Sequence, residues 1–541
     1  MGRSKVLSLF LFLLLPDLLF AQQPAFFVSF KSKFPSIYSI EHPESFLSCR
    51  AIENRKKNSI AISENDLPVS PKYLDSLKSN GATILFSSKW LNGAMISATD
   101  VQLQSISKLS FVKKVQSIVP KRTNYLSSVQ SVGGLQSTTD ISDVASYGQS
   151  YNQIRIPGVD EMHADGIFGN GVLIAVLDDG FKNVNTLPAF DSLFSFNRIK
   201  GTYDFVNNEN NVYNDGAGHG THVLSILAGY SEGNLIGAAW KADFLLLRTE
   251  NNTNETILEE YNWVRAAEYA DSAGADIISS SLGYNDFDNS ADNHLLSDLN
   301  GDKTVITIGA DIAASKGILV VSAAGNEGNS SWKTLLAPAD GDSVLTVGGI
   351  DLNGNHASFS STGPTYDGRI KPDVVTLSNS VRVATYTGGY SSGNGTSYAT
   401  PVISGMAAGL LQKYPHLTNM ELLDFIRVSA SQYYHPDFEK GYGIPNYKRA
   451  VQLIDASKSP LLFPNPTSDA QLHLHWALYQ KNQEMEVFYY SITGQLMASE
   501  KVKVESPIIP LVTDIQNWKT GVYLVKVHTP MSWFTLKLVR F

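Results

Sequence analysis

Three short segments of the chain carry side chains that together could perform nucleophilic catalysis. Asp178 follows an apolar run, His219 follows a glycine-rich loop, and Ser397 lies in the segment Gly395-Thr396-Ser397-Tyr398-Ala399-Thr400-Pro401. A serine hydroxyl becomes a good nucleophile when a neighbouring base removes its proton, and the base works best when a third group fixes its tautomer. The residue types therefore predict Ser397 as nucleophile, His219 as base and Asp178 as the group that orients the base.

Asn326 could complete this arrangement as an oxyanion donor, because it follows an apolar run within Ser322-Ala323-Ala324-Gly325-Asn326. A helix that begins at Ser397 would also point free backbone N–H groups at an oxyanion beside the serine. Each motif is weak alone, since a lone histidine is more often structural and Gly-Thr-Ser is an ordinary loop sequence. The order Asp, His, Asn, Ser within one domain, with each residue at an element boundary, favours one joint active site.

The segments between these residues predict a doubly wound α/β domain. Short strands that are apolar on both faces alternate with helices, which is typical of a parallel sheet covered by helices on both faces. Ligands bind beyond the carboxyl ends of such strands, where the four residues are expected to lie. The predicted strands are Val172–Leu177, Asp243–Leu247, Ile277–Ser281, Ile318–Ser322 and Val344–Val347, and the main helices are Ile257–Ala273, Thr307–Ser315 and Ser397–Lys413.

These motifs resemble those of the subtilisin-like serine peptidases over about residues 147 to 448. The most specific are His219-Gly-Thr-His-Val and Gly395-Thr-Ser-Tyr-Ala-Thr-Pro. The resemblance implies a subtilisin-like fold and an endopeptidase that hydrolyses peptide bonds in proteins through an acyl-enzyme on Ser397. It also implies His219 as general base and acid, Asp178 as its orienting partner and Asn326 as oxyanion donor.

Two further segments match the substrate-binding region of that family. Ser281-Leu282-Gly283 resembles the edge that pairs with the substrate backbone, and Ala323-Ala324-Gly325 resembles the opposite wall. Main-chain hydrogen bonds to an extended peptide would favour protein or peptide substrates. Asp179 departs from the commonest family pattern, which has Thr or Ser after the catalytic Asp. Neighbouring strand positions point in opposite directions, so Asp179 need not disturb Asp178.

The resemblance implies that the chemistry needs no cofactor, and no metal ligand is assigned. His222 lies three residues after His219, but the other ligands of a metal site are missing, which favours a packed helix residue. Residues 298–302 and 351–355 resemble the start of a calcium loop without its glutamate, so Asn-Gly turns are the better interpretation. Many relatives bind calcium, and a structural calcium ion with unknown ligands stays open.

Two other classes of protein fit the sequence less well than a peptidase does. A pseudo-enzyme that keeps the fold to bind peptides is disfavoured because all four predicted catalytic residues are present. An esterase of the α/β-hydrolase type would place Asp and His after a serine in a Gly-x-Ser-x-Gly elbow. In this chain both precede Ser397, and Ala399 replaces the last glycine.

The first 21 residues are predicted to be a signal peptide. Arg3 and Lys5 precede an apolar run that ends near Ala21, and this run is short for a membrane anchor. No later segment holds about 18 consecutive apolar residues, so we expect no transmembrane segment in the mature chain. The single cysteine, Cys49, excludes an intramolecular disulfide, and the net charge of -9 argues against a nucleic-acid partner.

Residues 22–120 are predicted to form a small α+β domain, followed by a linker at residues 121–146. The predicted strands are Phe26–Phe30, Ala82–Phe86, Gly93–Ser97 and Phe111–Val115, with helices at Tyr73–Ser79 and Asp100–Leu109. The segments Asp66-Leu-Pro-Val69 and Ser88-Lys-Trp-Leu-Asn92 resemble the propeptide of Bacteroidetes subtilisin relatives. That resemblance implies an intramolecular chaperone and inhibitor that is removed by cleavage in the linker. A permanent accessory domain is the alternative.

After the predicted catalytic domain at residues 147–456, residues 457–541 are predicted to form an all-β sandwich. Its strands include Leu472–Trp476, Met485–Tyr490 and Val522–Val527. Phe463-Pro-Asn-Pro466 and Gly521-Val-Tyr-Leu-Val-Lys526 resemble the C-terminal sorting domain of type IX secretion. This implies export through the inner membrane by the signal peptide, recognition by the type IX machinery, and then secretion or attachment at the cell surface. A β-sandwich that binds substrate or cell wall is the alternative.

Overall fold

The computed structural model describes residues 25–118, 144–456, 460–468, 471–476, 483–506, 508–529 and 533–541. The predicted signal peptide at residues 1–21 and most of the predicted linker at residues 121–146 lie outside these ranges. None of the described helices combines the length and the apolar character needed to cross a membrane.

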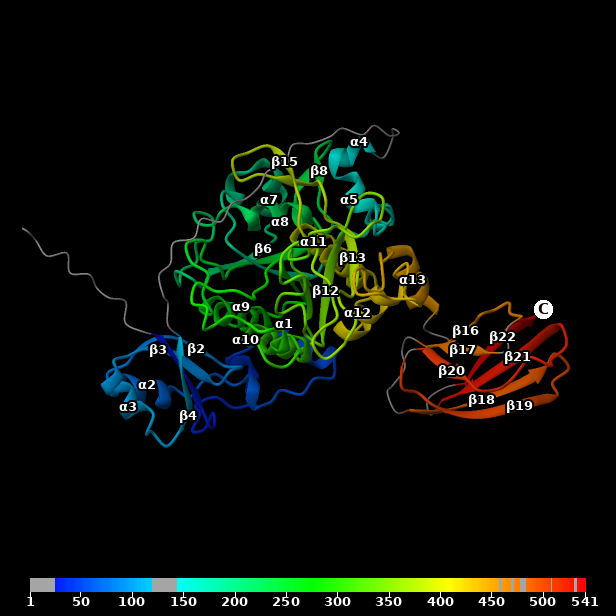
Figure 1. Cartoon of the computed structure of the whole chain (residues 1–541), viewed down its shortest axis with the longest axis horizontal. Coiled ribbons are helices and arrows are strands. Elements are labelled where there is room, and N and C mark those ends of the chain that lie inside the picture. Colours follow the sequence, from blue (N-terminus) through cyan, green and yellow to red (C-terminus); the bar gives the residue numbers. More distant parts are fainter. Residues whose placement is uncertain are drawn as a thin grey trace, which may run out of the picture. The chain divides into compact units, whose positions relative to one another are not determined.

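A seven-stranded, fully parallel sheet forms the centre of the predicted catalytic domain (Figure 1), which confirms the predicted doubly wound α/β class. The strand order is β13-β12-β11-β10-β5-β9-β6. The five predicted strands are present, while the half-exposed edge strand β6 and the short strand β13 were not predicted. The strands are β5 (Leu173–Asp178), β6 (Ile199–Asp204), β9 (Asp243–Arg248), β10 (Ile277–Ser280), β11 (Leu319–Ala323), β12 (Val344–Ile350) and β13 (Val374–Leu377).

Helices cover both faces of this sheet. Helices α8 and α11 pack against each other on one side, and α9 and α10 pack against each other on the other side (Figure 1). The core under α8 and α11 takes alternate residues of the strands, such as Ile174 and Val176 of β5, as a two-sided sheet requires. The main helices are α8 (His219–Ala228), α9 (Leu258–Ala273), α10 (Val305–Ser315), α11 (Thr396–Lys413), α12 (Asn419–Val428) and α13 (Tyr447–Ala456).

Shorter elements connect the sheet and its helices. They are α4 (Val144–Tyr147), α5 (Tyr151–Arg155), α6 (Val159–Ala164), α7 (Asp191–Ser195), β7 (Tyr230–Ser231), β8 (Leu235–Ile236), β14 (Val381–Ala384) and β15 (Tyr390–Gly393).

The N-terminal unit is a four-stranded sheet with two helices, in agreement with the predicted α+β fold. The strand order is β2-β3-β1-β4, and β1 pairs antiparallel with both β3 and β4. Its core joins Val28 and Ile96 of the sheet to Leu77 and Ile106 of the helices. The elements are β1 (Ala25–Phe30), β2 (Thr83–Ser88), β3 (Gly93–Ser97), β4 (Val112–Ile118), α2 (Pro71–Ser79) and α3 (Asp100–Ile106).

Two pieces of the N-terminal region belong to the same compact unit as the catalytic sheet. They are the segments Tyr38–Pro68 and Ser88–Trp90, whereas residues 25–37, 69–87 and 91–118 form a unit of their own. The segment Tyr38–Pro68 contains helix α1 (Cys49–Lys57), which the sequence did not predict. We call Tyr38–Pro68 the α1 segment.

The C-terminal region contains two antiparallel sheets, in agreement with the predicted all-β fold. Their orders are β16-β17-β20 and β19-β18-β21-β22. One core joins Leu474 and Ile509 of the first sheet to Val487 and Val525 of the second, as in a sandwich. The strands are β16 (Leu461–Phe463), β17 (Leu472–His475), β18 (Glu484–Ser491), β19 (Leu496–Lys503), β20 (Ile508–Leu511), β21 (Gly521–His528) and β22 (Trp533–Arg540).

Candidate active site

Asp178 and His219 meet at the carboxyl end of the parallel sheet. Asp178 is the last residue of β5 and His219 is the first residue of α8. The Nδ1 atom of His219 lies 2.7 Å from Oδ1 of Asp178, so the ring can donate its Nδ1–H to the carboxylate. Gly220 permits this close approach, because a Cβ atom there would lie 2.3 Å from the carbonyl oxygen of Gly180.

The environment of the pair favours a charged imidazole. Asp178 is fully buried, and its Oδ2 has no hydrogen-bond partner among the described residues. The His219 side chain is 33 % exposed. Burial lowers the pKa of His219, but the charge of Asp178 and the hydrogen bond between them overcome this effect and raise it to about 9. Asp178 is therefore placed to fix the tautomer of His219 and to stabilise the ring in its protonated form.

Asp179 holds the start of helix α8. Its Oδ1 accepts a hydrogen bond from Gly220 N at 2.8 Å, and its Oδ2 accepts from Ala217 N at 2.8 Å and from His219 N at 3.4 Å. A carboxylate at this position satisfies helix N–H groups that have no intrahelical partner and faces the positive end of the helix dipole. Asp179 thus positions the backbone of His219, a role that the sequence analysis did not foresee.

Ser397 lies in the first turn of helix α11, as predicted, and is joined to Ser281 beyond the end of β10. Pro401 has no N–H group, so it cannot donate to the carbonyl of Ser397 four residues earlier. That carbonyl instead accepts a hydrogen bond from Ser281 Oγ at 2.8 Å. The Ser397 Oγ donates to the Ser281 carbonyl at 3.2 Å and, within the described part of the chain, makes no hydrogen bond to His219. Catalytic hydrogen bonds are often loose in substrate-free enzymes and tighten on binding.

Asn326 follows β11 and is oriented by the residue before Ser397. Its Oδ1 accepts hydrogen bonds from Thr396 N at 2.9 Å and from Thr396 Oγ1 at 3.2 Å. Asn326 is exposed, and its Nδ2 makes no hydrogen bond to another described residue, so it can donate to another acceptor. The geometry therefore offers two donors near the serine, the Asn326 amide and the N–H groups at the start of α11.

The two predicted substrate-binding segments flank Ser397 in different ways. In Ser281-Leu282-Gly283, no hydrogen bond joins the backbone of Leu282 or Gly283 to another described residue. These groups are available to an extended peptide, as strand addition requires. In Ala323-Ala324-Gly325, Ala324 donates to the Val347 carbonyl and accepts from Leu336 N, so this side is a fixed wall.

Tyr398 is a site residue whose role the sequence analysis missed. Its ring lies beside that of His219, with centroids 5.9 Å apart and an angle of 27° between the planes. The Tyr398 hydroxyl lies 3.3 Å from Nδ1 of His222, and burial lowers the pKa of His222 to about 4. His222 is thus a neutral hydrogen-bonding residue of α8, as predicted. An aromatic residue directly after the candidate nucleophile was the available signal, but only the fold shows which ring it meets.

Two groups of three carboxylates are close enough to hold a cation, Asp204-Glu209-Asp215 and Glu250-Glu255-Glu259. In the first group Arg248 already provides a positive charge, 2.8 Å from Asp204 and 3.5 Å from Asp215. In the second group Oε1 of Glu250 accepts hydroxyl hydrogen bonds from Thr249 and Tyr284. Both clusters belong to the hydrogen-bond network of the protein, and neither is assigned to a metal ion.

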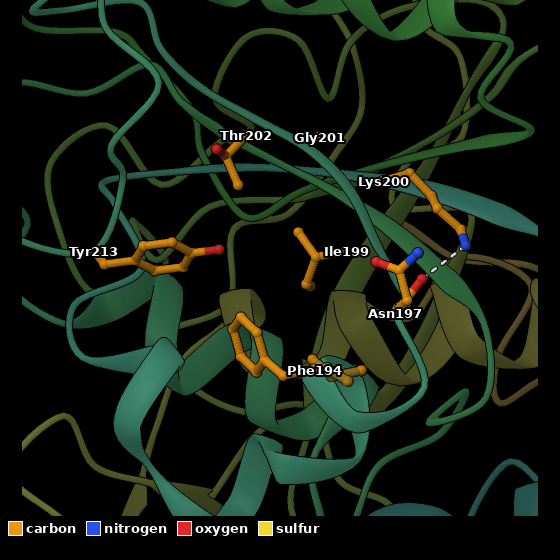
Figure 2. Close-up of a pocket in the computed structure, with 8 residues that line it drawn as sticks. Phe194, Asn197, Ile199, Lys200, Gly201, Thr202 and Tyr213 are labelled. Atoms are coloured by element: carbon orange, nitrogen blue, oxygen red, sulfur yellow. Dashed lines mark hydrogen bonds between the residues drawn. The ribbon is translucent and has the colours of Figure 1, made fainter.

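A pocket of about 320 Å³ lies elsewhere, along the edge strand β6. Figure 2 shows its lining, with the rings of Phe194 and Tyr213 beside the strand and a hydrogen bond from Lys200 to the Asn197 carbonyl. None of the predicted catalytic or substrate-binding residues lines it. The pocket is therefore separate from the candidate active site.

Three family models match successive parts of the chain. Residues 25–134 match the peptidase S8 propeptide domain of Bacteroidota, residues 169–443 match the subtilase family, and residues 461–539 match the secretion system C-terminal sorting domain. The order is the one expected from the sequence.

Curated relatives match the central part of the chain. Subtilisin from Bacillus pumilus is 34% identical over 308 residues, which cover 57% of this chain and 98% of that protein. Subtilisin E from Bacillus subtilis (strain 168) is 33% identical over 309 residues, which cover 57% of this chain and 71% of that protein. Among solved structures, the crystal structure of MycP1 from Mycobacterium smegmatis aligns with a TM-score of 0.44 at 23% identity, covering 57% of this chain and 86% of that one.

Proposed function

Since the chain belongs to the subtilase family and is a serine endopeptidase made as a precursor, we propose that Ser397, His219 and Asp178 carry out its chemistry. The observation that carries this assignment is the 2.7 Å contact between His219 Nδ1 and Asp178 Oδ1, at the edge of the sheet where the first turn of α11 holds Ser397. Asn326 serves as oxyanion donor, and Ser281-Leu282-Gly283 with Ala323-Ala324-Gly325 holds the peptide.

In the acylation step, Ser397 Oγ attacks the carbonyl carbon of the scissile peptide bond while His219 Nε2 accepts the serine proton. The carbonyl oxygen becomes an oxyanion, and the Asn326 Nδ2 group and the N–H group of Ser397 donate hydrogen bonds to it. The C–N bond then breaks as the imidazolium returns the proton to the leaving amine. The product is an ester between Ser397 and the acyl half of the substrate.

In the deacylation step, water attacks the ester carbonyl while His219 Nε2 takes its proton. The same two donors stabilise the second oxyanion. The C–O bond to Ser397 breaks, the serine oxygen recovers the proton, and the acid product leaves. Asp178 remains ionised throughout and stabilises the imidazolium in both steps. Apart from the substrate and water, every group in this scheme belongs to the chain itself, and no ligands are assigned to a structural calcium ion.

The flanking regions support a proposal for how the peptidase is regulated and where it is localised. We assign residues 1–21 to a signal peptide for export through the inner membrane, residues 22–120 to an inhibitory propeptide, residues 121–146 to a linker that is cut, residues 147–456 to the catalytic domain and residues 457–541 to the sorting domain. The matched sorting domain supports secretion or attachment at the cell surface. Deletion of the residues after Pro460 should retain the protein in the periplasm, and normal export of the shortened protein would exclude the sorting role.

Covalent labelling tests the catalytic assignment directly. A fluorophosphonate probe should label the mature protein at Ser397, and mass spectrometry of the labelled peptide should locate the adduct. The Ser397→Ala protein should take no label, while Ser392→Ala, which changes an exposed serine of β15, should be labelled like the wild type. A folded wild-type protein that neither takes the label nor cleaves casein would instead be a peptide-binding pseudo-enzyme.

A further inference from the structure

The α1 segment is joined to the catalytic domain by a network of fully buried charges. Arg55 of α1 is 2 % exposed, Asp66 of the same segment is 0 % exposed, and Asp271 of α9 is 1 % exposed. The guanidinium of Arg55 lies 2.6 Å from Asp271 and 3.0 Å from Asp66. Arg55 of the α1 segment therefore neutralises Asp66 of the same segment and Asp271 of the catalytic domain.

Two lysines extend this network in opposite directions. Lys316, which follows α10, lies 2.9 Å from Asp66, so a cation of the catalytic domain reaches an anion of the α1 segment. Lys89 of the propeptide lies 3.0 Å from the second oxygen of Asp271. Each side thus contributes both a cation and an anion that find their partners on the other side.

The α1 segment also satisfies the ends of two catalytic-domain helices. Arg55 donates to the Lys316 carbonyl at 2.6 Å, and Arg50 and Asn54 donate to the Gly274 carbonyl at 2.9 Å and 3.0 Å. These carbonyls lie at the C-terminal ends of α10 and α9, where backbone acceptors lack intrahelical partners and a positive charge is favourable. A Cβ atom on Gly274 would lie 2.6 Å from Ala51 N, so glycine is required for this approach.

We propose that this network, formed by Arg55, Asp66, Lys89, Asp271 and Lys316, is a latch that recognises the propeptide and keeps it bound after the linker is cut. The proposal rests on the proposed function, because it concerns the regulation of the same peptidase. The recognition surface is the C-terminal ends of α9 and α10, and its partner is the α1 segment of a chain with the same charges. In this chain the five charged residues then set how long the cut propeptide stays bound, and so the delay before activity appears.

The physical argument for selectivity is the cost of an unpaired buried charge. A catalytic domain without a carboxylate at position 271 would remove the anion that Arg55 and Lys89 share, and one without a cation at position 316 would remove a partner of Asp66. Loss of one partner from a buried ion network is strongly unfavourable, whereas an exposed pair contributes little. The latch therefore favours the catalytic domain of the same chain and disfavours a domain that lacks the charge at position 271 or 316.

The test uses the full-length chain with Ser397→Ala and a specific protease site placed between residues 121 and 146. After cutting, gel filtration shows whether the propeptide stays bound, and its dissociation rate is measured. We expect Asp271→Asn and Arg55→Met each to release the propeptide roughly a hundredfold to a thousandfold faster. The double variant should lose less than the product of the two single effects, because both changes break the same pair.

Lys56→Met is the matched control, since Lys56 lies on the same helix, is exposed, and its side chain makes no hydrogen bond or ion pair to another described residue. It should accelerate release several-fold at most. Thermal unfolding of the uncut proteins checks folding. If Asp271→Asn does not fold, Lys89→Met, which removes one contact to the same carboxylate, decides the question. Release of either variant at the rate of the Lys56→Met protein would overturn the latch.

A second readout separates this proposal from the proposed function. In chains that keep Ser397, the interval between linker cleavage and the rise of peptidase activity should shorten for Arg55→Met, while kcat/KM of the fully released enzyme stays at the wild-type value. A failure of hydrolysis in every chain would refute the catalytic assignment and leave the retention measurement intact. An unchanged interval with normal hydrolysis would refute the latch alone.

Discussion

The candidate active site and the latch use similar groups in opposite settings. At the active site His219 is partly exposed and Asn326 is open to solvent, so both can meet a substrate. In the latch Arg55, Asp66 and Asp271 are enclosed and each already has a charged partner. The exposed groups of the active site can reach a substrate, whereas the enclosed groups of the latch contact only the partners that they already hold.

The two regions also differ in how the chain assembles them. Each catalytic residue lies where a strand ends or a helix begins, and its position follows from elements next to it in the sequence. The latch joins residues separated by up to 261 positions, such as Arg55 and Lys316. We therefore expect changes at the active site to alter turnover with little effect on propeptide binding, and changes in the latch to do the reverse.

Replacement of the nucleophile tests this separation most severely. Ser397→Ala should lower kcat by about a million-fold, the loss known for removal of the nucleophile in subtilisin itself. The precursor should then accumulate uncut when it is expressed alone, as seen by the mass of the purified protein. Maturation of the Ser397→Ala protein without another protease would show that a different enzyme processes the chain. Retention of the propeptide after an external cut should match that of the parent protein.

Asn326→Ala should produce the next largest loss. Removal of one oxyanion donor lowers kcat by about a hundredfold to a thousandfold, a value obtained for subtilisin, to which this chain is related. KM should change little, because the donor acts mainly on the charge that develops in the transition state. Steady-state kinetics on a fluorogenic peptide separates the two constants. A loss confined to KM would mean that Asn326 contacts the bound substrate instead of the oxyanion.

The sequence predicted the active-site elements because their local patterns are strong. Strand β5 is apolar on both faces up to Asp178, and α11 begins at a glycine-rich loop, so both boundaries were visible. Helix α1 was missed because its buried positions are Ala51 and Arg55, and a buried arginine breaks the apolar periodicity on which helix prediction depends. The partner of Arg55 is created only by the tertiary fold.

Two active-site details were missed for the same reason. The ring of Tyr398 meets His219 because α8 and α11 pack against each other, which no local pattern encodes. Asp179 was expected to be harmless to Asp178, but its hydrogen bonds to the start of α8 depend on the position of a loop almost forty residues later. Residue types and boundaries were predictable, whereas side-chain partners across the fold were not.

Substitution of Tyr398 tests how the ring beside His219 contributes to the candidate active site. Loss of the ring in Tyr398→Ala should lower kcat/KM by up to about tenfold, the amount that an aromatic contact of this kind contributes. Tyr398→Phe keeps the ring and loses only the hydroxyl contact to His222, so it should retain activity within about twofold. The pH profile of kcat/KM distinguishes positioning from simple destabilisation, because only a change beside His219 moves its midpoint. Equal losses in both variants would assign the effect to the hydroxyl.

Asp179→Asn should have the smallest effect and the clearest sign. His219 must be neutral to accept the serine proton, so kcat/KM rises as pH rises through the pKa of His219. Burial lowers that pKa, Asp178 raises it most, and the charge of Asp179 raises it further. Asparagine carries no charge and keeps only one acceptor oxygen, so it loses either the bond from Gly220 N or those from Ala217 N and His219 N. The acid limb of the profile should therefore move to lower pH, with a few-fold gain below the wild-type midpoint. The control variant Asp191→Asn changes an exposed aspartate of α7 and should not move the acid limb. A shift of the limb to higher pH would mean that Asp179 acts through the position of His219 and not through its own charge.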